Sequence, residues 1–220
     1  MNVDNDQSVA SGVSAVHGQY GRLDAVVACA GWGLAGAVEN TEIAEARHQF
    51  ETNFWGAARL VRAALPVMRA QGAGRVVLVS SLAGLVGIPF QAFYSASKFA
   101  MEGYAEALAY EVAPFGVEVC LVQPGNVRTD FTANRRQVTP QGEDDPYRAT
   151  VSKAVGKMAR DEANGVPAEA VSAAIQRVLE SRRPPRRRPV GKASERVGVL
   201  TKRILPFRVF EKAAKGGLGV

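Results

Sequence analysis

The sequence predicts an α/β protein built around a doubly wound parallel sheet. Short apolar runs alternate along the chain with segments in which apolar residues recur at helical spacing. The apolar runs are continuous rather than alternating, which is typical of parallel strands buried on both faces. Glycine and proline stand at the ends of most segments and mark the expected turns.

The first half of the chain divides into two helical segments and two strands. In chain order we expect a helix over residues 6–20, a strand over 24–29, a long helical stretch over 41–70 and a strand over 75–79. Gly21 ends the first helix, and Gly72 and Gly74 end the second, because glycine readily adopts the backbone conformation that stops a helix.

The second half repeats this alternation and then becomes polar. We expect a helix over residues 94–112, a strand over 117–122, a long polar loop over 126–146, helices over 147–164 and 167–181, a basic proline-rich connector over 182–189, and a last helical segment over 194–214. Pro206 should break that last helix, since proline cannot continue the hydrogen-bond ladder.

The composition indicates a globular protein. Of 220 residues, 47% are hydrophobic and 22% are charged, which excludes disorder for most of the chain. Cys29 and Cys120 lie in apolar runs and are expected to be reduced, which favours a cytoplasmic location. The first residues are acidic and polar, unlike a secretory signal. The uncharged stretch 76–97 contains Pro89 and several polar residues, so we do not expect it to span a membrane.

The basic character of the chain is confined to its last part. The net charge of +6 is the sum of +10 from Ser181 onward and −4 before it. We therefore expect no nucleic-acid binding, and we interpret the arginines between 182 and 188 as a solvated connector, with phosphate binding as the alternative. His17 and His48 show no metal-ligand spacing, so no metal site is expected.

One cluster of residues predicts acid–base chemistry. Tyr94 and Lys98 are four residues apart, so a helix places both side chains on one face. A free tyrosine titrates near pH 10, about 3 units above neutral pH, and a nearby cation lowers an acid's pKa by roughly 1–3 units. Lys98 with a second positive charge, such as an oxidised nicotinamide ring, would make Tyr94 a base that works near neutral pH. Ser81 follows a strand, where it could bond a carbonyl or alcohol oxygen.

A tyrosine–lysine pair at this spacing is common by chance, and here the context adds specificity. The serine follows an apolar strand, a glycine-rich loop comes next, and the tyrosine opens a helix. In these features residues 2–189 resemble the short-chain dehydrogenase/reductase family. The resemblance implies a Rossmann-like fold and a catalytic set of Asn53, Ser81, Tyr94 and Lys98.

The same resemblance assigns further roles. Asn53, in the run Thr-Asn-Phe-Trp-Gly, would hold a water that links Lys98 to solvent as a proton relay. The cofactor, NAD or NADP, would contact Tyr94, Lys98 and three short runs, namely Asn2-Val3, Ala30-Gly31 and Pro124-Gly125-Asn126-Val127-Arg128-Thr129. Within the last run, Val127 and Thr129 would meet the nicotinamide carboxamide. The run that begins at Tyr94 is also similar to members that act on steroids and retinoids.

One part of the family's cofactor site has no counterpart in these residues. The family holds the pyrophosphate with a Thr-Gly-x-x-x-Gly-x-Gly turn before a helix. The glycines at 31, 33 and 36 imitate a dinucleotide fingerprint, but they align with the loop after the family's fourth strand. In that alignment the first βαβ units are missing, together with the residue that selects NAD or NADP.

We therefore carry three interpretations of the chain. The start codon is assigned too late and the natural protein is longer; or the chain is a truncated product that binds cofactor poorly; or it is a binding or membrane-associated protein that has lost catalysis. The expected activity of the family is the interconversion of a secondary alcohol and a carbonyl in a small-molecule substrate, commonly by a homo-oligomer.

The last residues are expected to form a separate unit. We divide the chain into an incomplete dehydrogenase domain over 1–190 and a basic helical tail over 191–220. Apolar residues of 194–214 fall on one helical face with cations between them. A lid over the substrate cleft or a subunit contact is preferred to a membrane-surface helix, because Pro206 would interrupt a long interfacial helix.

Overall fold

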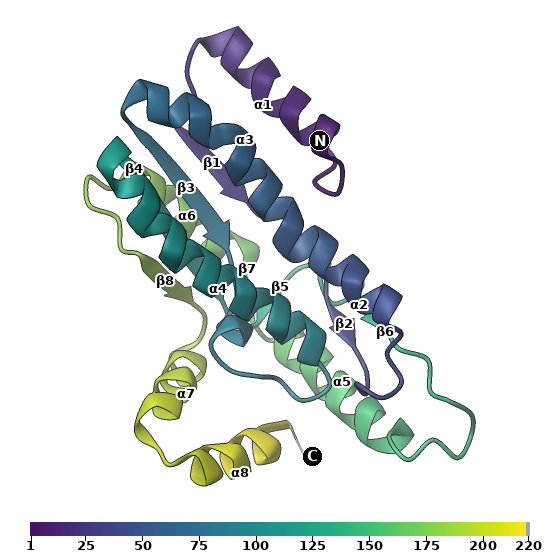
Figure 1. Ribbon diagram of the computed structural model, residues 1–220. Coiled ribbons are helices and arrows are strands. Elements are labelled where there is room, and N and C mark those ends of the chain that lie inside the picture. Colours follow the sequence, from purple (N-terminus) through teal and green to yellow (C-terminus); the bar gives the residue numbers. More distant parts are fainter. Residues whose placement is uncertain (219–220) are drawn as a thin grey trace.

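A computed structural model describes residues 1–218 and confirms the α/β fold (Figure 1). Its main sheet is parallel and has the strand order β1 (Ala25–Ala28), β3 (Gly74–Val79), β4 (Val117–Pro124) and β8 (Arg187–Val190). Two short parallel pairs lie outside it: β2 (Leu34–Ala35) with β6 (Arg136–Gln137), and β5 (Val127–Arg128) with β7 (Val166–Pro167).

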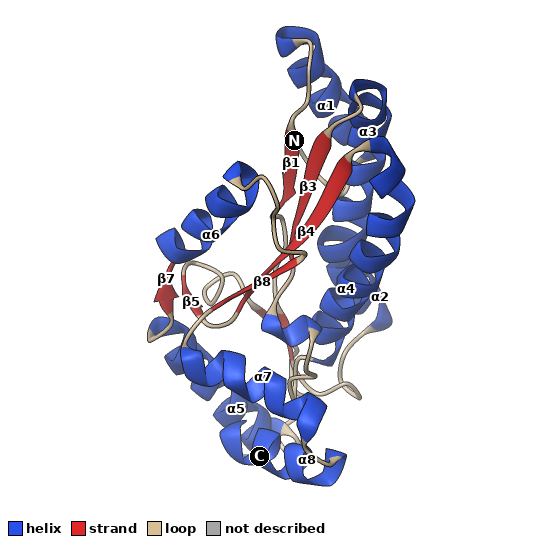
Figure 2. Ribbon diagram, turned by 90° about the vertical axis from the view of Figure 1, so that its left-hand side faces the viewer, coloured by secondary structure: helices blue, strands red, loops and turns tan. Residues whose placement is uncertain are grey.

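Helices cover both faces of the sheet. Figure 2 shows α3 (Gly56–Gln71) and α4 (Ala92–Val112) on one face, with α1 (Asp6–Tyr20) packed on α3, and α6 (Ala168–Glu180) on the other face. The remaining helices are α2 (Ile43–Phe50), α5 (Arg148–Ala163), α7 (Ala193–Ile204) and α8 (Phe207–Leu218). This two-sided covering is the doubly wound arrangement that the sequence predicts.

The core follows from the two-residue repeat of the strands. Along β3, Val76 and Leu78 point into the cluster under α3 and α4, whereas Val77 points into the smaller cluster under α6. Val119 and Cys120 of β4 divide between the two clusters in the same way. Because alternate residues face opposite sides of a strand, a continuous apolar run fills both cores.

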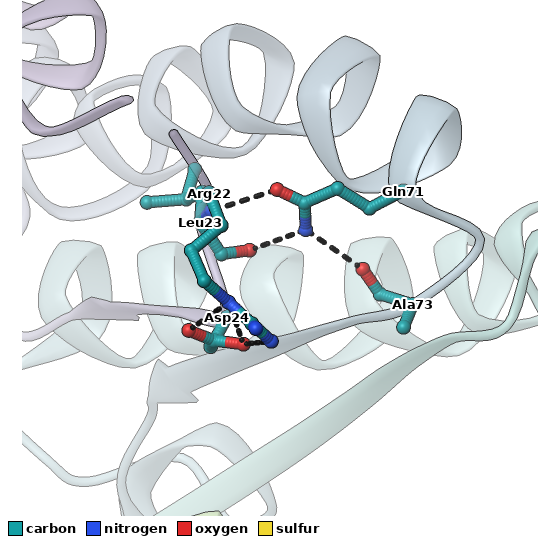
Figure 3. A network of polar contacts seen from close by, with 5 residues as sticks. All are labelled: Arg22, Leu23, Asp24, Gln71 and Ala73. Carbon is teal, nitrogen blue, oxygen red and sulfur yellow. Dashed lines mark hydrogen bonds and ion pairs between the residues drawn. The ribbon is translucent and has the colours of Figure 1, made fainter. Parts of the chain in front are cut away.

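Local signals fix the ends of the first elements. The Asn5 side chain accepts a hydrogen bond from the Ser8 amide at the start of α1, and Gly21, with φ of 69°, ends that helix. Figure 3 shows a second set of contacts, made by the Gln71 carboxamide at the end of α3. It accepts a hydrogen bond from the Leu23 backbone N–H, at 2.7 Å, and donates one to the Leu23 carbonyl, at 3.0 Å. These contacts tie the segment that enters β1 to the turn between α3 and β3.

Two sequence-based expectations differ from the structure. The connector predicted over 182–189 is wrong in its last part, where Arg187–Val190 form the fourth strand of the sheet. An edge strand tolerates Pro189, and the Arg187 guanidinium pairs with the carboxylates of Glu102 and Glu106 on α4. The predicted loop 126–146 also contains the short strands β5 and β6.

The long helical stretch predicted over 41–70 is present but not uniform. It consists of α2, a π-helical turn over Glu51–Trp55, and α3, with the Gly56 amide bonded five residues back to the Glu51 carbonyl. Among the described helices, none is long and apolar enough to cross a membrane.

Candidate active site

A cavity of about 650 Å³ opens at the carboxyl ends of the central strands. Cys29 follows β1, Ser80 and Ser81 follow β3, and Pro124 and Gly125 end β4, and all five line the cavity. In open α/β sheets this edge is where ligands bind, because successive loops there diverge and leave a crevice. Tyr94 and Lys98 enter the same cavity from the first turns of α4.

Tyr94 is a buried phenol in the cavity wall. Its residue is 8% exposed, and its ring lies 5.7 Å, centroid to centroid, from that of Phe131. Burial raises the pKa of Tyr94 above its ordinary value, and a hydrogen bond with Ser81 opposes that rise. Glu162 also raises this pKa and Arg135 lowers it. In the chain by itself Tyr94 therefore keeps its proton at neutral pH.

Lys98 lies one helical turn after Tyr94, as the spacing predicts. Its ammonium nitrogen is 5.9 Å from the centre of the Tyr94 ring and donates a hydrogen bond of 3.0 Å to the Val79 carbonyl. Burial lowers the pKa of Lys98 to about 8, while the nearby Cys29 and Glu102 act to raise it. A lysine of this pKa is still mainly protonated at neutral pH.

Ser81 is held between β3 and β4. Its hydroxyl accepts a hydrogen bond from the Ala83 amide, at 3.1 Å, and donates one to the Pro124 carbonyl, at 3.2 Å. These two contacts keep the hydroxyl beside Tyr94. The neighbouring Ser80 is 3% exposed, and its hydroxyl has no hydrogen-bond partner within the described part of the chain.

Asn53 lies in the π-helical turn and is fully buried. Its carboxamide accepts from the Trp32 amide at 2.9 Å and donates to the Trp32 carbonyl at 3.0 Å and to the Ser97 hydroxyl at 3.2 Å. The Ser97 hydroxyl in turn donates to the Tyr94 carbonyl at 2.7 Å. Single π-turns inside α-helices recur at functional sites. Here Asn53 ties the loop after β1 to the turn of α4 that carries Tyr94.

The residues expected to hold the cofactor fall into two groups. Gly31, Pro124, Gly125, Val127 and Thr129 line the cavity together with Tyr94 and Lys98. By contrast, Ala30 is exposed and outside the lining, and the segment of Asn2 and Val3 lies against the start of α3 instead. There a Cβ added to Gly56 would stand 2.7 Å from a methyl carbon of Val3.

A glycine in the cavity wall leaves room for a nicotinamide cofactor. A Cβ at Gly31 would lie 3.1 Å from the Asn53 oxygen and 3.7 Å from the Lys98 nitrogen. Glycine at this position therefore lets a ligand approach the backbone and the two side chains. The residues at this end fit the nicotinamide half of the cofactor. None of residues 1–218 supplies the glycine-rich turn at a helix N-terminus that would fit the pyrophosphate. β2 lies between Gly33 and Gly36, and the next helix, α2, begins only at Ile43.

The structure adds residues that the sequence did not single out. Phe131, Met158 and Glu162, from the polar loop and α5, complete the cavity. Glu162 forms a buried ion pair with Arg135, and the Arg135 Nε–H has no partner within residues 1–218. No local pattern marks these positions, because tertiary packing alone brings the loop and α5 to Tyr94.

The C-terminal helices close the remaining side. Glu195, Gly198, Val199 and Thr201 of α7, and Phe210 of α8, line the cavity. The Lys202 ammonium donates to the Leu85 carbonyl at 2.6 Å and lies 4.9 Å from the centre of the Phe99 ring. This placement supports the lid predicted for the tail.

The family comparison decides to which family the chain belongs. The model of the short chain dehydrogenase family matches residues 1–139, which is more than half of the chain. The chain belongs to the short-chain dehydrogenase family. This confirms the resemblance drawn from Ser81, Tyr94 and Lys98, and it identifies the chain as an oxidoreductase of that family.

Two curated relatives are enzymes. The 3-ketodihydrosphingosine reductase of Bacteroides thetaiotaomicron is 38% identical over 215 residues, which are 98% of this chain and 80% of the reductase. Retinol dehydrogenase 8 of Bos taurus is 44% identical over 131 residues, which are 60% of this chain and 41% of that enzyme. The similarity to a retinol dehydrogenase thus covers more than half of the chain.

Two solved structures support the same fold. A short-chain dehydrogenase from Streptomyces avermitilis has a TM-score of 0.79 and 34% identity, covering 98% of this chain and 78% of that one. ElxO, solved with NADP bound, has a TM-score of 0.58 and 29% identity, covering 59% of this chain and 53% of that one. The comparison with ElxO therefore supports a nicotinamide cofactor for this short-chain dehydrogenase.

Proposed function

We propose that this short-chain dehydrogenase interconverts a carbonyl group and a secondary alcohol on an apolar substrate, with NAD or NADP as cofactor and Tyr94 as the acid/base. The observation that carries the proposal is the buried Tyr94 phenol, which lies in the wall of an apolar cavity beside Ser81 and one helical turn from Lys98.

In reduction, Tyr94 donates its proton to the carbonyl oxygen of the substrate. The raised pKa of Tyr94 keeps that proton available at neutral pH. The Ser81 hydroxyl turns its proton from the Pro124 carbonyl to the substrate oxygen and so positions it beside the phenol. When bound, a nicotinamide cofactor supplies or accepts the hydride. In oxidation of the alcohol, the proton returns to Tyr94.

Lys98 stabilises the phenolate that remains after the proton leaves Tyr94. Its positive charge lies on the same helix face, inside the protein, where a charge interaction is stronger than in water. Asn53 positions Tyr94 through Ser97, and the water relay from Lys98 to solvent is the further role that we propose for it.

The substrate class follows from the lining of the cavity. Val86, Ile88, Met158, Val171 and Ile175 are among the many apolar side chains that surround the site. The two relatives act, by their names, on 3-ketodihydrosphingosine and on retinol, both of which are long lipid molecules. Both lines of support favour an extended apolar alcohol or ketone over a small polar one.

A second candidate function uses the same cavity without turnover. Residues 1–218 contain no glycine-rich turn for the pyrophosphate, which favours a binding protein that holds an apolar ligand in the cavity. We prefer the enzyme because Ser81, Tyr94 and Lys98, the residues that proton transfer would use, all line the same cavity.

The experiment is a substrate series measured with millimolar NADH and NADPH. Ketones of increasing chain length should be reduced, and KM should fall about fourfold for each methylene that enters the cavity, which corresponds to about 0.8 kcal/mol per buried CH₂. A rate independent of chain length would contradict the apolar substrate class. Ligand binding without consumption of either cofactor would contradict the enzyme and support the binding protein.

A further inference from the structure

The two C-terminal helices have a second face that the cavity does not use. In α7 the cavity-lining residues Glu195, Gly198 and Val199 recur at three- and four-residue spacing, so they form one face of the helix. Lys202, on the same face, bonds the Leu85 carbonyl. This face is therefore occupied by the body of the protein.

The opposite face of α7 is apolar and exposed. Val197, Leu200 and Ile204 are also spaced by three and four residues, and they are 56%, 54% and 80% exposed. Pro206 separates α7 from α8, and just beyond it Phe207 is 71% exposed and Val209 is 52% exposed. Five large apolar side chains thus lie in water on two adjacent short helices. A soluble surface rarely gathers such residues without a partner.

Cations stand among these apolar residues. Lys192, Arg196, Arg208 and Lys212 are exposed, on a tail whose charge is strongly positive while the first 180 residues are net negative. A face that combines exposed aliphatic and aromatic side chains with lysine and arginine is typical of helices that lie in the interface of a membrane.

The position of the helices suits contact with a flat surface. Figures 1 and 2 both place α7 and α8 at the end of the molecule opposite α1, next to α5. The outward face can therefore meet a surface without interference from the sheet or from α1. Because no described helix is long and apolar enough to span a bilayer, such contact would be interfacial.

We propose that the exposed apolar side chains of α7 and α8, namely Val197, Leu200, Ile204, Phe207 and Val209, dock together with their neighbouring cations on the surface of an anionic lipid membrane. Charge complementarity selects this occupant. A second copy that packed its own tail on this one would cover the apolar residues but bring like charges together, whereas an anionic bilayer attracts each cation. Since the inner face of the same helices lines the cavity, docking also brings the lid to the lipid phase.

The test is co-sedimentation of the full chain with vesicles of phosphatidylcholine, with or without phosphatidylserine. The wild-type chain should bind the vesicles that contain phosphatidylserine, with an affinity that falls as salt rises. The triple variant Arg196→Gln, Arg208→Gln, Lys212→Gln should bind about 100-fold more weakly, since each cation near an anionic surface contributes a factor of about five. The triple variant Leu200→Ser, Ile204→Ser, Phe207→Ser should lose at least about tenfold.

A matched control removes three exposed arginines from the rest of the protein. Arg47→Gln, Arg62→Gln, Arg177→Gln, on α2, α3 and α6, should bind vesicles as the wild type does. Equal binding to both vesicle types, no binding to either, or equal weakening by the two charge variants would overturn the proposal. Sedimentation velocity supplies the remaining outcome. If the serine variant breaks an oligomer and no vesicle binding is seen, a second copy covers this face. None of these readouts depends on turnover.

Discussion

Asn53 offers a prediction whose size follows from counting the partners that its removal leaves unpaired. In Asn53→Ala the Trp32 carbonyl still accepts from the Gln49 amide, at 3.1 Å, and the Ser97 hydroxyl still donates to the Tyr94 carbonyl. Only the N–H of the half-buried Trp32 loses its acceptor, which costs about 1–3 kcal/mol. The lost packing of a fully buried side chain adds about 1 kcal/mol. We expect the free energy of unfolding to fall by about 2–4 kcal/mol.

Urea unfolding of the full chain measures this change. The midpoint should move to lower urea while the dependence of the free energy on denaturant stays the same. Asn134→Ala, at an exposed asparagine, is the control and should change stability by less than about 0.5 kcal/mol. A loss below about 1 kcal/mol in Asn53→Ala would refute the view that this carboxamide anchors the Trp32 loop.

Three further predictions concern charge and cofactor. Between pH 8 and 10.5 unfolded Lys98 keeps a proton that folded Lys98 has lost, so the free energy of unfolding of the wild type should rise with pH relative to that of Lys98→Met, by about 3 kcal/mol in total. Urea unfolding at several pH values measures this. A difference between the two proteins that does not change with pH would contradict the lowered pKa of Lys98. Arg135→Met leaves the buried Glu162 carboxylate without its cationic partner and should lower the free energy of unfolding in urea by about 3–5 kcal/mol. The double variant Arg135→Met, Glu162→Met should recover much of this loss. Calorimetry should give millimolar dissociation constants for NADH and NADPH, because residues 1–218 lack the glycine-rich turn; micromolar affinity would mean that another segment forms the phosphate site.

The elements that the sequence predicts well are those with local signals. The helix over Asp6–Tyr20 has both of its predicted ends, because Asn5 caps it and Gly21 stops it. Tyr94, Lys98 and Ser81 converge because a helix turn and a strand end determine their placement, and both can be inferred from spacing. The division of the chain at residue 190, the homo-oligomer and the cytoplasmic location stay predictions.

The parts that the sequence does not predict depend on distant partners. β8 has no apolar run, since it is an edge strand whose arginine is neutralised by glutamates on α4. Phe131, Glu162 and Phe210 reach the cavity from three separate segments. The direction of the Tyr94 pKa also depends on tertiary packing. Lys98 together with an oxidised nicotinamide ring is expected to lower it, whereas in the chain by itself burial is the largest cause and raises it.

The central claim is that Tyr94 is the proton donor, and the most direct measurement is the turnover of Tyr94→Phe against that of Tyr110→Phe. Both tyrosines lie on α4, and Tyr110 is 68% exposed and outside the cavity. With a long-chain ketone and millimolar cofactor, Tyr94→Phe should lose about 10²-fold or more in kcat, the usual contribution of general acid–base catalysis, and Tyr110→Phe should keep the wild-type rate. Near-normal turnover by Tyr94→Phe would contradict the account.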